Sequence, residues 1–553
     1  MAEAEHDTAG HDIADTAEYD IADTSEYDMV IVGAGFAGLY MLHRAHKLGL
    51  RVLVFEAGGD VGGTWYWNRY PGARCDVESM EYSYQFDDDL QQEWQWSERY
   101  SAQPEILRYV NHVADRFGLR GYIQFDTRVS AATFDEATNR WVISTDHQSV
   151  RAQWMVMATG CLSSANTPAF PGIESFAGPM YHTGKWPHEG VDFTGKRVGV
   201  IGTGSSGIQA IPIIAAQCTD LIVFQRTANY SIPAHNGQLD RDYEQQVKAS
   251  YTEFRAANSL MPGAFGSKMP RGDKPALAVD DETRKHDFEY RWNEVGGFAF
   301  LGGFVDLLID PNANETAAQF ARDRIHDLVH DQAVADLLSP KQVIGCKRLC
   351  LDTGYFETFN RDNVHLVDIS SAPIERLTTR AVVTGGTEYE VDCLVFATGF
   401  DAMTGTLMSI DIRGRDGLGI SDAWSAGPRT YLGLQVAGFP NMFTISGPGS
   451  PSVLTNMIVS IEQHVNFIAD CIAHLREHGH ARIEATEQAQ DAWVEHVNMI
   501  ADLTLYPTCN SWYLGANVPG KTRVFMPLLG FPPYVDKCNE VVANGYEGFA
   551  LSA

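Results

Sequence analysis

Short apolar runs alternate with helix-like periodicity along most of this chain. Runs rich in β-branched residues at 29–32 and 197–201 each end in a glycine-rich turn, and each turn opens a stretch with apolar residues at helical spacing. Two further runs, at 154–157 and 394–396, are each followed by an Ala-Thr-Gly triplet, which suits either a close backbone approach or a simple turn. This alternation of strands and helices predicts an α/β fold with parallel sheets.

The two glycine-rich turns predict two dinucleotide sites. The first turn contains Gly33, Gly35, Phe36 and Gly38, and the second runs through Gly202, Thr203, Gly204, Ser205, Ser206 and Gly207. In a strand-turn-helix unit, such glycines permit a tight turn and bring the backbone close to a pyrophosphate at the helix N-terminus. Because strand and helix patterns flank both turns, we predict two Rossmann-like domains.

The residue at the end of the next strand differs between the two units. Glu56 lies 23 positions after Gly33, where a carboxylate can accept hydrogen bonds from an adenosine ribose. The equivalent offset in the second unit reaches Gln225 and then Arg226, whose guanidinium can pair with a 2′-phosphate. We therefore predict FAD in the first unit and NADPH in the second. A solvated arginine without a ligand is the alternative for Arg226.

The sequence pattern also predicts the domain boundaries. Residues 1–26 contain most of an eight-residue duplication and too little hydrophobicity to offset ordering entropy, so we predict a disordered acidic leader. From 236 to 335, strand signals give way to charged helical periodicity, which predicts a helical insertion. The other segments predict an FAD-binding domain at 27–160 and 390–553 and an NADPH-binding domain at 161–235 and 336–389.

Charge and cysteine content limit the classes of function. The formal net charge of −30, with ten acidic and no Lys or Arg residues in 1–28, argues against nucleic acid or an anionic membrane as a partner. The chain shows neither a membrane-spanning run nor a signal peptide. Nine cysteines without paired spacing predict reduced thiols in a cytoplasmic protein. We expect a monomer or small homo-oligomer. Cys346 and Cys350 lack the companions of a zinc site, so no metal is predicted.

A flavin reduced by NADPH must pass its electrons to an acceptor. Disulfide reductases with two dinucleotide units place a pair of cysteines after the first FAD contacts, whereas residues 62–75 of this chain contain Cys75 alone. Reduction of a disulfide is therefore disfavoured, and molecular oxygen is the main candidate for the acceptor.

Residues 176–187 make the interpretation specific. The segment matches the pattern F-x-G-x-x-x-H-x-x-x-W-P at every defined position, with His182 at its centre. It resembles the fingerprint of type I Baeyer–Villiger monooxygenases, and the resemblance extends from about residue 27 to the C-terminus, most closely to the phenylacetone- and steroid-oxidising members. The resemblance implies an NADPH- and FAD-dependent enzyme that uses O2 to convert a small-molecule ketone into an ester or lactone. His182 is expected to brace the linker between the domains.

The resemblance also implies catalytic and cofactor-binding residues. In the family, NADPH reduces FAD, O2 adds at the flavin C4a, and the resulting peroxyflavin attacks the ketone beside a fixed cation. Arg348 matches the catalytic arginine, which stays charged at any working pH, and Asp76 matches its carboxylate partner. Lys347 is expected to contact the NADPH phosphate. Further cofactor contacts are expected at Gly63, Thr64, Trp65, Tyr82, Val129 and Thr227.

Two further features have open interpretations. Trp512 matches a loop residue of the family that reaches the nicotinamide, although Trp512 and Tyr513 suit a buried core pair equally well. Residues 447–452 precede a long helical pattern at 457–475. A helix starting there would aim its amides at an anionic reduced flavin, or it would be an ordinary capped core helix.

The substrate and two alternative functions stay open. The resemblance places a substrate pocket at Cys161, Leu162, Pro451, Met457 and Tyr513, and it leaves linear, aryl, cyclic and steroid ketones as candidates. A flavin-containing monooxygenase would oxygenate sulfur or nitrogen instead of a carbonyl carbon. A non-catalytic flavoprotein would bind both cofactors without turnover.

Overall fold

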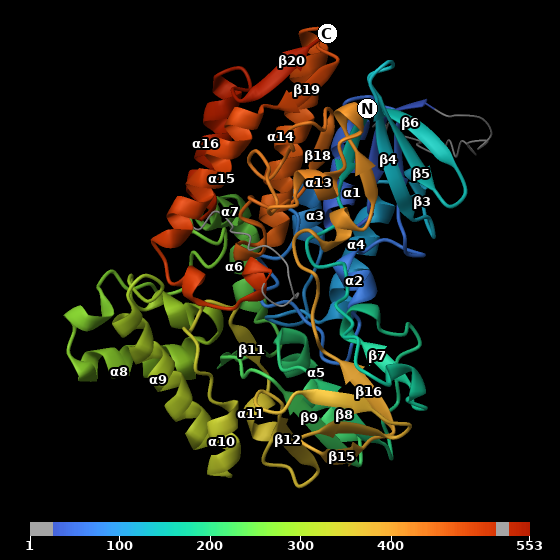
Figure 1. The fold of residues 1–553 in the computed structure, drawn as a ribbon. Helices are drawn as coiled ribbons and strands as arrows, with labels where there is room; N and C mark the ends of the chain where they lie inside the picture. The colour runs from blue at the N-terminus through green and yellow to red at the C-terminus, as the bar shows by residue number, and fades with distance from the viewer. Residues whose placement is uncertain (1–25, 516–529) are drawn as a thin grey trace, which may run out of the picture.

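Two α/β lobes form the body of the protein in a computed structural model that describes residues 26–515 and 530–553 (Figure 1). Strands β1 and β4 to β6 lie in one lobe, strands β8, β9, β12 and β16 lie in the other, and helices α8 to α10 project from the side. The predicted leader lies outside the described residues except for Glu26, which begins β1.

The first lobe is built on an eight-stranded sheet in the order β17-β4-β5-β6-β1-β2-β3, with β18 paired to β6. β1 pairs in parallel with β2 and β6, and β4, β5 and β6 form an antiparallel meander. The strands are β1 (Glu26–Val32), β2 (Val52–Phe55), β3 (Ile123–Gln124), β4 (Val129–Asp135), β5 (Arg140–Thr145), β6 (Ser149–Met157), β17 (Asp411–Arg413) and β18 (Met442–Thr444). Because β17 and β18 come from the last third of the chain, the C-terminal segment returns to this lobe.

The second lobe contains a five-stranded parallel sheet in the order β12-β9-β8-β16-β7. Its strands are β7 (Met180–His182), β8 (Arg197–Ile201), β9 (Asp220–Gln225), β12 (Val364–Asp368) and β16 (Cys393–Phe396). Since β16 pairs with β7 and β8, the chain crosses back to the first lobe after Phe396, a few residues beyond the expected boundary at 390. The predicted α/β class with two Rossmann-like units is confirmed.

Both glycine-rich turns open long helices. α1 (Phe36–Lys47) follows β1, and α5 (Ser205–Gln217) follows β8. α14 (Met457–Glu477) packs against α1, where the Tyr40 hydroxyl donates to Asn466 Oδ1 at 2.8 Å. This contact holds a C-terminal helix against the helix that follows the first turn.

The predicted insertion is helical. Between β10 (Ser231–Pro233) and β11 (Cys350–Asp352), the described chain forms helices and loops only. The helices are α6 (Arg241–Ala249), α7 (Tyr251–Ser259), α8 (Asp281–Tyr290), α9 (Pro311–Leu328), α10 (Gln332–Leu338) and a 3-10 helix, η6 (Gly297–Gly302). α8, α9 and η6 pack around a buried aromatic core that includes Phe288, Trp292 and Phe300. Buried residues of α6 and α7 instead join the core of the first lobe, and those of α10 join the core of the second.

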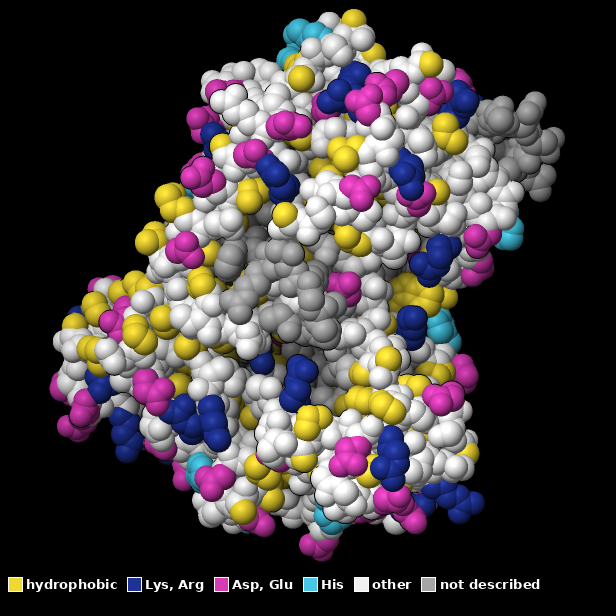
Figure 2. Space-filling model, viewed as in Figure 1, with side chains coloured by type: hydrophobic (Ala, Val, Ile, Leu, Met, Phe, Trp, Pro, Cys, Tyr) yellow, Lys and Arg dark blue, Asp and Glu magenta, His cyan; other side chains and the backbone are white. Residues whose placement is uncertain are grey.

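The remaining elements cover the two sheets. They are α2 (Thr64–Trp67), α3 (Asp88–Glu93), α4 (Gln103–Arg116), α11 (Tyr355–Thr358), α12 (Gly405–Met408), α13 (Ile420–Ala423), α15 (Glu487–Asp502), α16 (Phe531–Ala543), β13 (Ile374–Leu377), β14 (Ala381–Thr384), β15 (Thr387–Glu390), β19 (Arg482–Ala485) and β20 (Phe549–Ser552). Within the described ranges, no helix has the length and apolar character needed to cross a membrane. Figure 2 shows acidic and basic side chains interspersed over one face.

Candidate active site

The two glycine-rich turns have the same backbone construction. Gly33 has φ +105°, and a Cβ there would lie 2.6 Å from the carbonyl oxygen of Ala158. Gly202 has φ +109°, and its Cβ would lie 2.5 Å from the carbonyl oxygen of Ala397. Each Ala-Thr-Gly triplet therefore packs directly beneath a glycine turn, and both first glycines are required by steric contact and by backbone conformation.

The helices after these turns present uncapped N-termini. Gly35 and Gly204 occupy the N-cap positions of α1 and α5 and supply no side-chain acceptor. α3, α6, α8, α9, α10, α14 and α15 are capped by Asp, Asn or Thr side chains, whereas α4, α7 and α16 also lack a side-chain cap. The first-turn amides of α1 and α5 are thus left for another anionic acceptor, which a pyrophosphate would supply.

Glu56 is positioned to bind a ribose next to the first turn. It follows β2, is 5% exposed, and accepts hydrogen bonds from the backbone N–H groups of Ala34 and Gly58, each at 2.7 Å. Burial raises the pKa of Glu56, and these backbone bonds oppose the rise. Each carboxylate oxygen accepts one backbone bond and has a second lone pair suited to a ribose hydroxyl. The residues of this unit therefore fit FAD.

One large cavity, of about 550 Å³, joins the first turn to Arg348. Gly63 supports this junction, because a Cβ at Gly63 would come within 2.9 Å of Gly35 Cα. The indole N–H of Trp65 donates to the Tyr82 hydroxyl at 3.2 Å. The predicted residues that line the cavity are Gly33, Gly35, Phe36, Glu56, Gly63, Thr64, Trp65, Asp76, Tyr82, Val129, Cys161, Leu162, Ser205, Arg348, Met457 and Trp512.

Other predicted residues lie outside this lining. Gly38 and Gly207 pack against the carbonyl oxygens of Gly33 and Gly202, respectively. They therefore allow each helix to pack closely against its own turn. The other predicted residues outside the lining are Gly202, Thr203, Gly204, Ser206, Arg226, Thr227, Lys347, Pro451 and Tyr513.

Two cations lie together beyond the second turn. Arg226 is exposed at the end of β9, and burial together with the nearby Arg226 charge lowers the pKa of Lys347. Neither side chain forms an ion pair with any carboxylate in the described part of the chain. The Thr203 hydroxyl donates to the carbonyl of Thr227 at 3.1 Å, which ties the turn to the segment carrying Arg226. Two neighbouring cations of this kind fit a phosphate.

Arg348 and Asp76 form an ion pair between distant parts of the chain. Arg348 Nη2 donates to Asp76 Oδ1 at 2.8 Å and Nε donates to Oδ2 at 2.5 Å, while Nη1 donates to the Val453 carbonyl. Burial alone would lower the pKa of Arg348, but the charge and hydrogen bonds of Asp76 raise it above the ordinary value. The site therefore holds a permanent cation that is anchored by hydrogen bonds along its edge.

An apolar wall lies next to this cation. Cys161, Leu162, Met457, Trp512 and Tyr513 pack in one hydrophobic cluster. Burial raises the pKa values of Cys161 and Tyr513, which favours the neutral thiol and phenol. The sequence analysis missed other members of this cluster, which are Ala402, Met403, Val453, Leu454 and Tyr506. Val453 and Leu454 could have been found from their position two and three residues after Pro451.

The long helix beside the cavity begins where the helical pattern predicts it. α14 starts at Met457, and Asn456 caps it by accepting from the Ile458 N–H at 3.2 Å. Residues 452–454 form a separate 3-10 turn. The helix is therefore confirmed, and its N-cap is the side chain of Asn456. Thr455 and Met457 line the cavity.

The prediction of reduced thiols is wrong for two cysteines. Cys346 and Cys509 form a disulfide, whereas the other seven cysteines are free and buried. The pair is separated by 163 positions, so the sequence contains no local spacing that reveals it. The disulfide connects the segment of Arg348 to the segment of Trp512. The described residues contain no group of three or more His, Cys, Asp or Glu that could hold a metal.

His182 lies at the junction between the lobes. Its Nδ1 accepts from the Gly184 N–H at 2.9 Å, and its Nε2 lies 3.3 Å from the Thr398 hydroxyl. Thr398 in turn donates to the Asn166 carbonyl at 2.5 Å. Burial lowers the pKa of His182 and thus favours the neutral ring that these contacts use. The contacts suit the expected bracing role.

Together, the two glycine-rich turns, Glu56 and the buried cation define a flavoprotein with two dinucleotide units. Residues 30–258 match the family described as pyridine nucleotide-disulphide oxidoreductase. A Baeyer-Villiger monooxygenase from Pseudooceanicola batsensis is 43% identical over 94% of this chain and 95% of its own length. A phenazine N-monooxygenase from Lysobacter antibioticus is 39% identical over 94% of this chain and 96% of its own.

Solved structures agree with these relatives. Oxidized steroid monooxygenase bound to NADP is 52% identical, with a TM-score of 0.90 over 96% of this chain and 100% of that one. A structure of OTEMO with FAD and NADP is 40% identical, with a TM-score of 0.91 over 95% and 99% of the two chains. The chain belongs to the Baeyer–Villiger monooxygenase family. The predicted family and enzyme class are confirmed.

Proposed function

We propose that this chain is an FAD- and NADPH-dependent Baeyer–Villiger monooxygenase that inserts one oxygen atom from O2 beside a ketone carbonyl, giving an ester or lactone. The observation that carries the proposal is the Arg348–Asp76 pair, which lies in the same cavity as the first glycine turn and an apolar wall. When bound, FAD supplies the activation of oxygen and NADPH supplies the hydride.

Each lobe binds one of the two cofactors. We assign FAD to the first lobe, where the α1 amides receive the pyrophosphate and Glu56 receives the ribose. We assign NADPH to the second lobe, where the α5 amides receive its pyrophosphate and Arg226, Thr227 and Lys347 surround its 2′-phosphate. Trp512, which lines the cavity, is assigned to the nicotinamide side.

Arg348 stabilises negative charge in the reaction. Its guanidinium is anchored at its edge by Asp76 and by the Val453 carbonyl, so it is already placed to meet the charge that develops on the ketone oxygen. It also keeps its own protons at any working pH, so it does not neutralise the anion that attacks the carbonyl. Cys161, Leu162 and Met457 exclude water from the reacting carbon.

Oxygenation of nitrogen or sulfur is a second candidate function. A relative named phenazine N-monooxygenase is as similar to this chain as some ketone-oxidising relatives are. A soft nucleophilic substrate would take an electrophilic oxygen atom and would not need the fixed cation of Arg348. The two functions therefore differ in their dependence on this arginine.

A product screen tests the proposal. Purified protein with NADPH is given linear, aryl, cyclic and steroid ketones, together with a thioether and a tertiary amine, and the products are read by mass. We expect an ester or lactone from at least one ketone class, accompanied by stoichiometric NADPH consumption. Products from the thioether and amine alone would support the second function, and hydrogen peroxide without any oxygenated product would overturn both.

A further inference from the structure

Phe298 of the helical insertion reaches the arginine of the proposed site. The centre of its ring lies 4.8 Å from Arg348 Cζ, so the guanidinium lies over the ring. Phe298 belongs to η6 and is only partly buried in the cluster of Tyr100, Ala234 and Leu351. A segment with no cofactor contact assigned to it therefore touches the reactive cation.

The ring restricts a motion that the other contacts leave open. Asp76 and the Val453 carbonyl hold Arg348 through hydrogen bonds at the edge of the guanidinium plane. Hydrogen bonds at the edge permit the plane to tilt about the bidentate axis, whereas the contact with the Phe298 ring opposes any tilt that would move the cation off the ring. Attraction between a cation and the negative face of an aromatic ring adds to this restraint and is stronger where water is excluded.

The turn that carries Phe298 has a conformation that requires glycine. Gly296 has φ +75° and Gly297 has φ +59°. A Cβ at Gly296 would lie 2.3 Å from the Pro233 carbonyl oxygen, and a Cβ at Gly297 would lie 2.9 Å from the Tyr100 hydroxyl. These two positions therefore set where η6 begins, and with it the place of the Phe298 ring.

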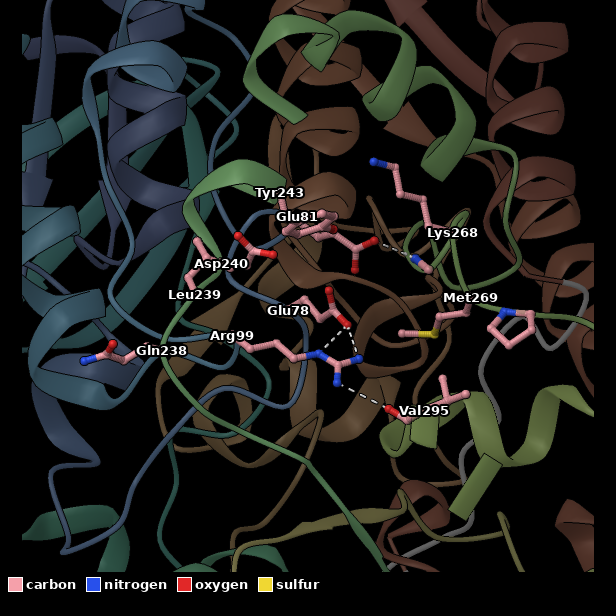
Figure 3. Close-up of a pocket in the computed structure, with 12 residues that line it drawn as sticks. Glu78, Glu81, Arg99, Gln238, Leu239, Asp240, Tyr243, Lys268, Met269 and Val295 are labelled. Carbon is pink, nitrogen blue, oxygen red and sulfur yellow. Dashed lines mark hydrogen bonds and ion pairs between the residues drawn. The ribbon is translucent and has the colours of Figure 1, made fainter. Parts of the chain in front are cut away.

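A clamp joins this turn to the segment that carries Asp76. Arg99 donates to Glu78 Oε1 through Nε at 2.9 Å and Nη2 at 2.6 Å, and through Nη1 to the Val295 carbonyl at 3.3 Å (Figure 3). Glu78 lies two residues after Asp76, and Val295 lies three residues before Phe298. The carboxylate and the ring that hold Arg348 are thus tied to each other through residues that do not line the cavity.

We propose that Phe298 is a positioning residue that fixes the plane of the Arg348 guanidinium for ketone oxygenation, which gives the helical insertion a direct part in the reaction. This inference rests on the proposed function. Phe265 provides a matched control, because its ring lies 5.5 Å from the Phe298 ring, one aromatic contact further from the arginine.

Graded fluorination of Phe298 tests the inference without changing the shape of the site appreciably. Full-length enzyme carrying phenylalanine, 4-fluorophenylalanine or 3,4,5-trifluorophenylalanine at this position is compared for ester formation at saturating ketone and, without oxygen, for flavin reduction by NADPH. We expect the rate of ester formation to fall stepwise with fluorination, to about a tenth, because fluorine withdraws charge from the ring face. Flavin reduction should stay unchanged.

Genetic variants provide a second comparison. Phe298→Leu should match the trifluorinated enzyme, Phe298→Tyr should retain most ester formation, and Phe265→Leu should resemble the wild type. Equal rates across the fluorinated series, or equal losses from Phe298→Leu and Phe265→Leu, would overturn the inference alone. Absence of ester from the wild type would overturn the proposed function and, with it, this inference.

Discussion

The two strand-turn-helix units share a backbone but end in opposite charges. Gly33 and Gly202 pack against matching alanine carbonyls, and both following helices begin without a capping side chain. After the second strand, however, the first unit presents the buried carboxylate of Glu56, whereas the second presents the exposed cation of Arg226. The shared glycine turn suits the pyrophosphate, which both cofactors contain. The opposite charges suit the adenosine riboses, which differ because only that of NADPH carries a 2′-phosphate.

The site between the units uses one residue from each side. Asp76 follows the first glycine unit in the chain, and Arg348 lies just before β11, next to the segment that carries Lys347. The residues of the site therefore fall into three groups: one binds FAD, one binds NADPH and one stabilises negative charge on the substrate. A substitution in one group should impair the function of that group and leave the other two functions intact.

Arg348→Ala should have the largest effect. Ester formation should fall by about a hundredfold or more, as expected when a fixed group stabilising transition-state charge is removed. Flavin reduction by NADPH under anaerobic conditions should change little, because both nucleotide units remain. Arg361→Ala, an exposed arginine on the second lobe, is the control. Equal loss of reduction and ester formation would mean that Arg348 serves cofactor binding instead.

Arg226→Ala should affect only the second unit. Loss of a charge-assisted pair should raise the KM for NADPH about tenfold to a hundredfold, and it should leave the KM for NADH nearly unchanged. Arg226→Lys should restore part of the preference, because it retains the charge without the forked geometry. A similar rise for both nucleotides would remove the assignment of the phosphate to Arg226.

Glu56→Gln should affect only the first unit. The amide retains the size of the side chain but loses the charge that strengthens hydrogen bonds from ribose hydroxyls, so FAD affinity should fall about tenfold. The ratio of flavin to protein after dialysis measures this loss, and the KM for NADPH in protein reconstituted with excess FAD is the control. Full retention of FAD would show that Glu56 only stabilises the backbone through its hydrogen bonds and does not bind the ribose.

The smallest expected effect is a pH dependence of cofactor binding that differs between the two units. FAD binding should weaken on acidification, and NADPH binding should weaken at alkaline pH. Burial raises the pKa of Glu56, so acidification should weaken FAD binding earlier than an ordinary glutamate would. Burial and the charge of Arg226 lower the pKa of Lys347, so the KM for NADPH should begin to rise at a lower alkaline pH than an ordinary lysine predicts. The KM for NADH should show no such rise. A rise shared by both nucleotides would contradict the role of Lys347.

The sequence predicted those parts of the fold that depend on local pattern. The runs before each glycine turn form β1 and β8, and the triplets at 158–160 and 397–399 lie beneath the turns. The helical pattern from Met457 forms α14, because its apolar periodicity is local. Its cap at Asn456 was not predicted, because the role of this side chain appears only from the path of the backbone.

Contacts between distant segments could not be predicted from local pattern. The bond between Cys346 and Cys509 spans 163 positions without a spacing rule. The ring of Phe298 covers Arg348 because two glycines with positive φ redirect the insertion toward the site. Pairing of Arg348 with Asp76 was expected from family resemblance, since composition alone does not distinguish one arginine among 41 Lys and Arg residues.

Isotope labelling tests the central claim most directly. Purified enzyme with NADPH and a ketone substrate is allowed to react under 18O2, and the product is analysed by mass spectrometry. The account predicts an ester or lactone that carries one 18O atom in its new ring or chain position, in an amount that matches the NADPH consumed. NADPH oxidation that yields only labelled hydrogen peroxide, with the ketone recovered unchanged, would contradict it.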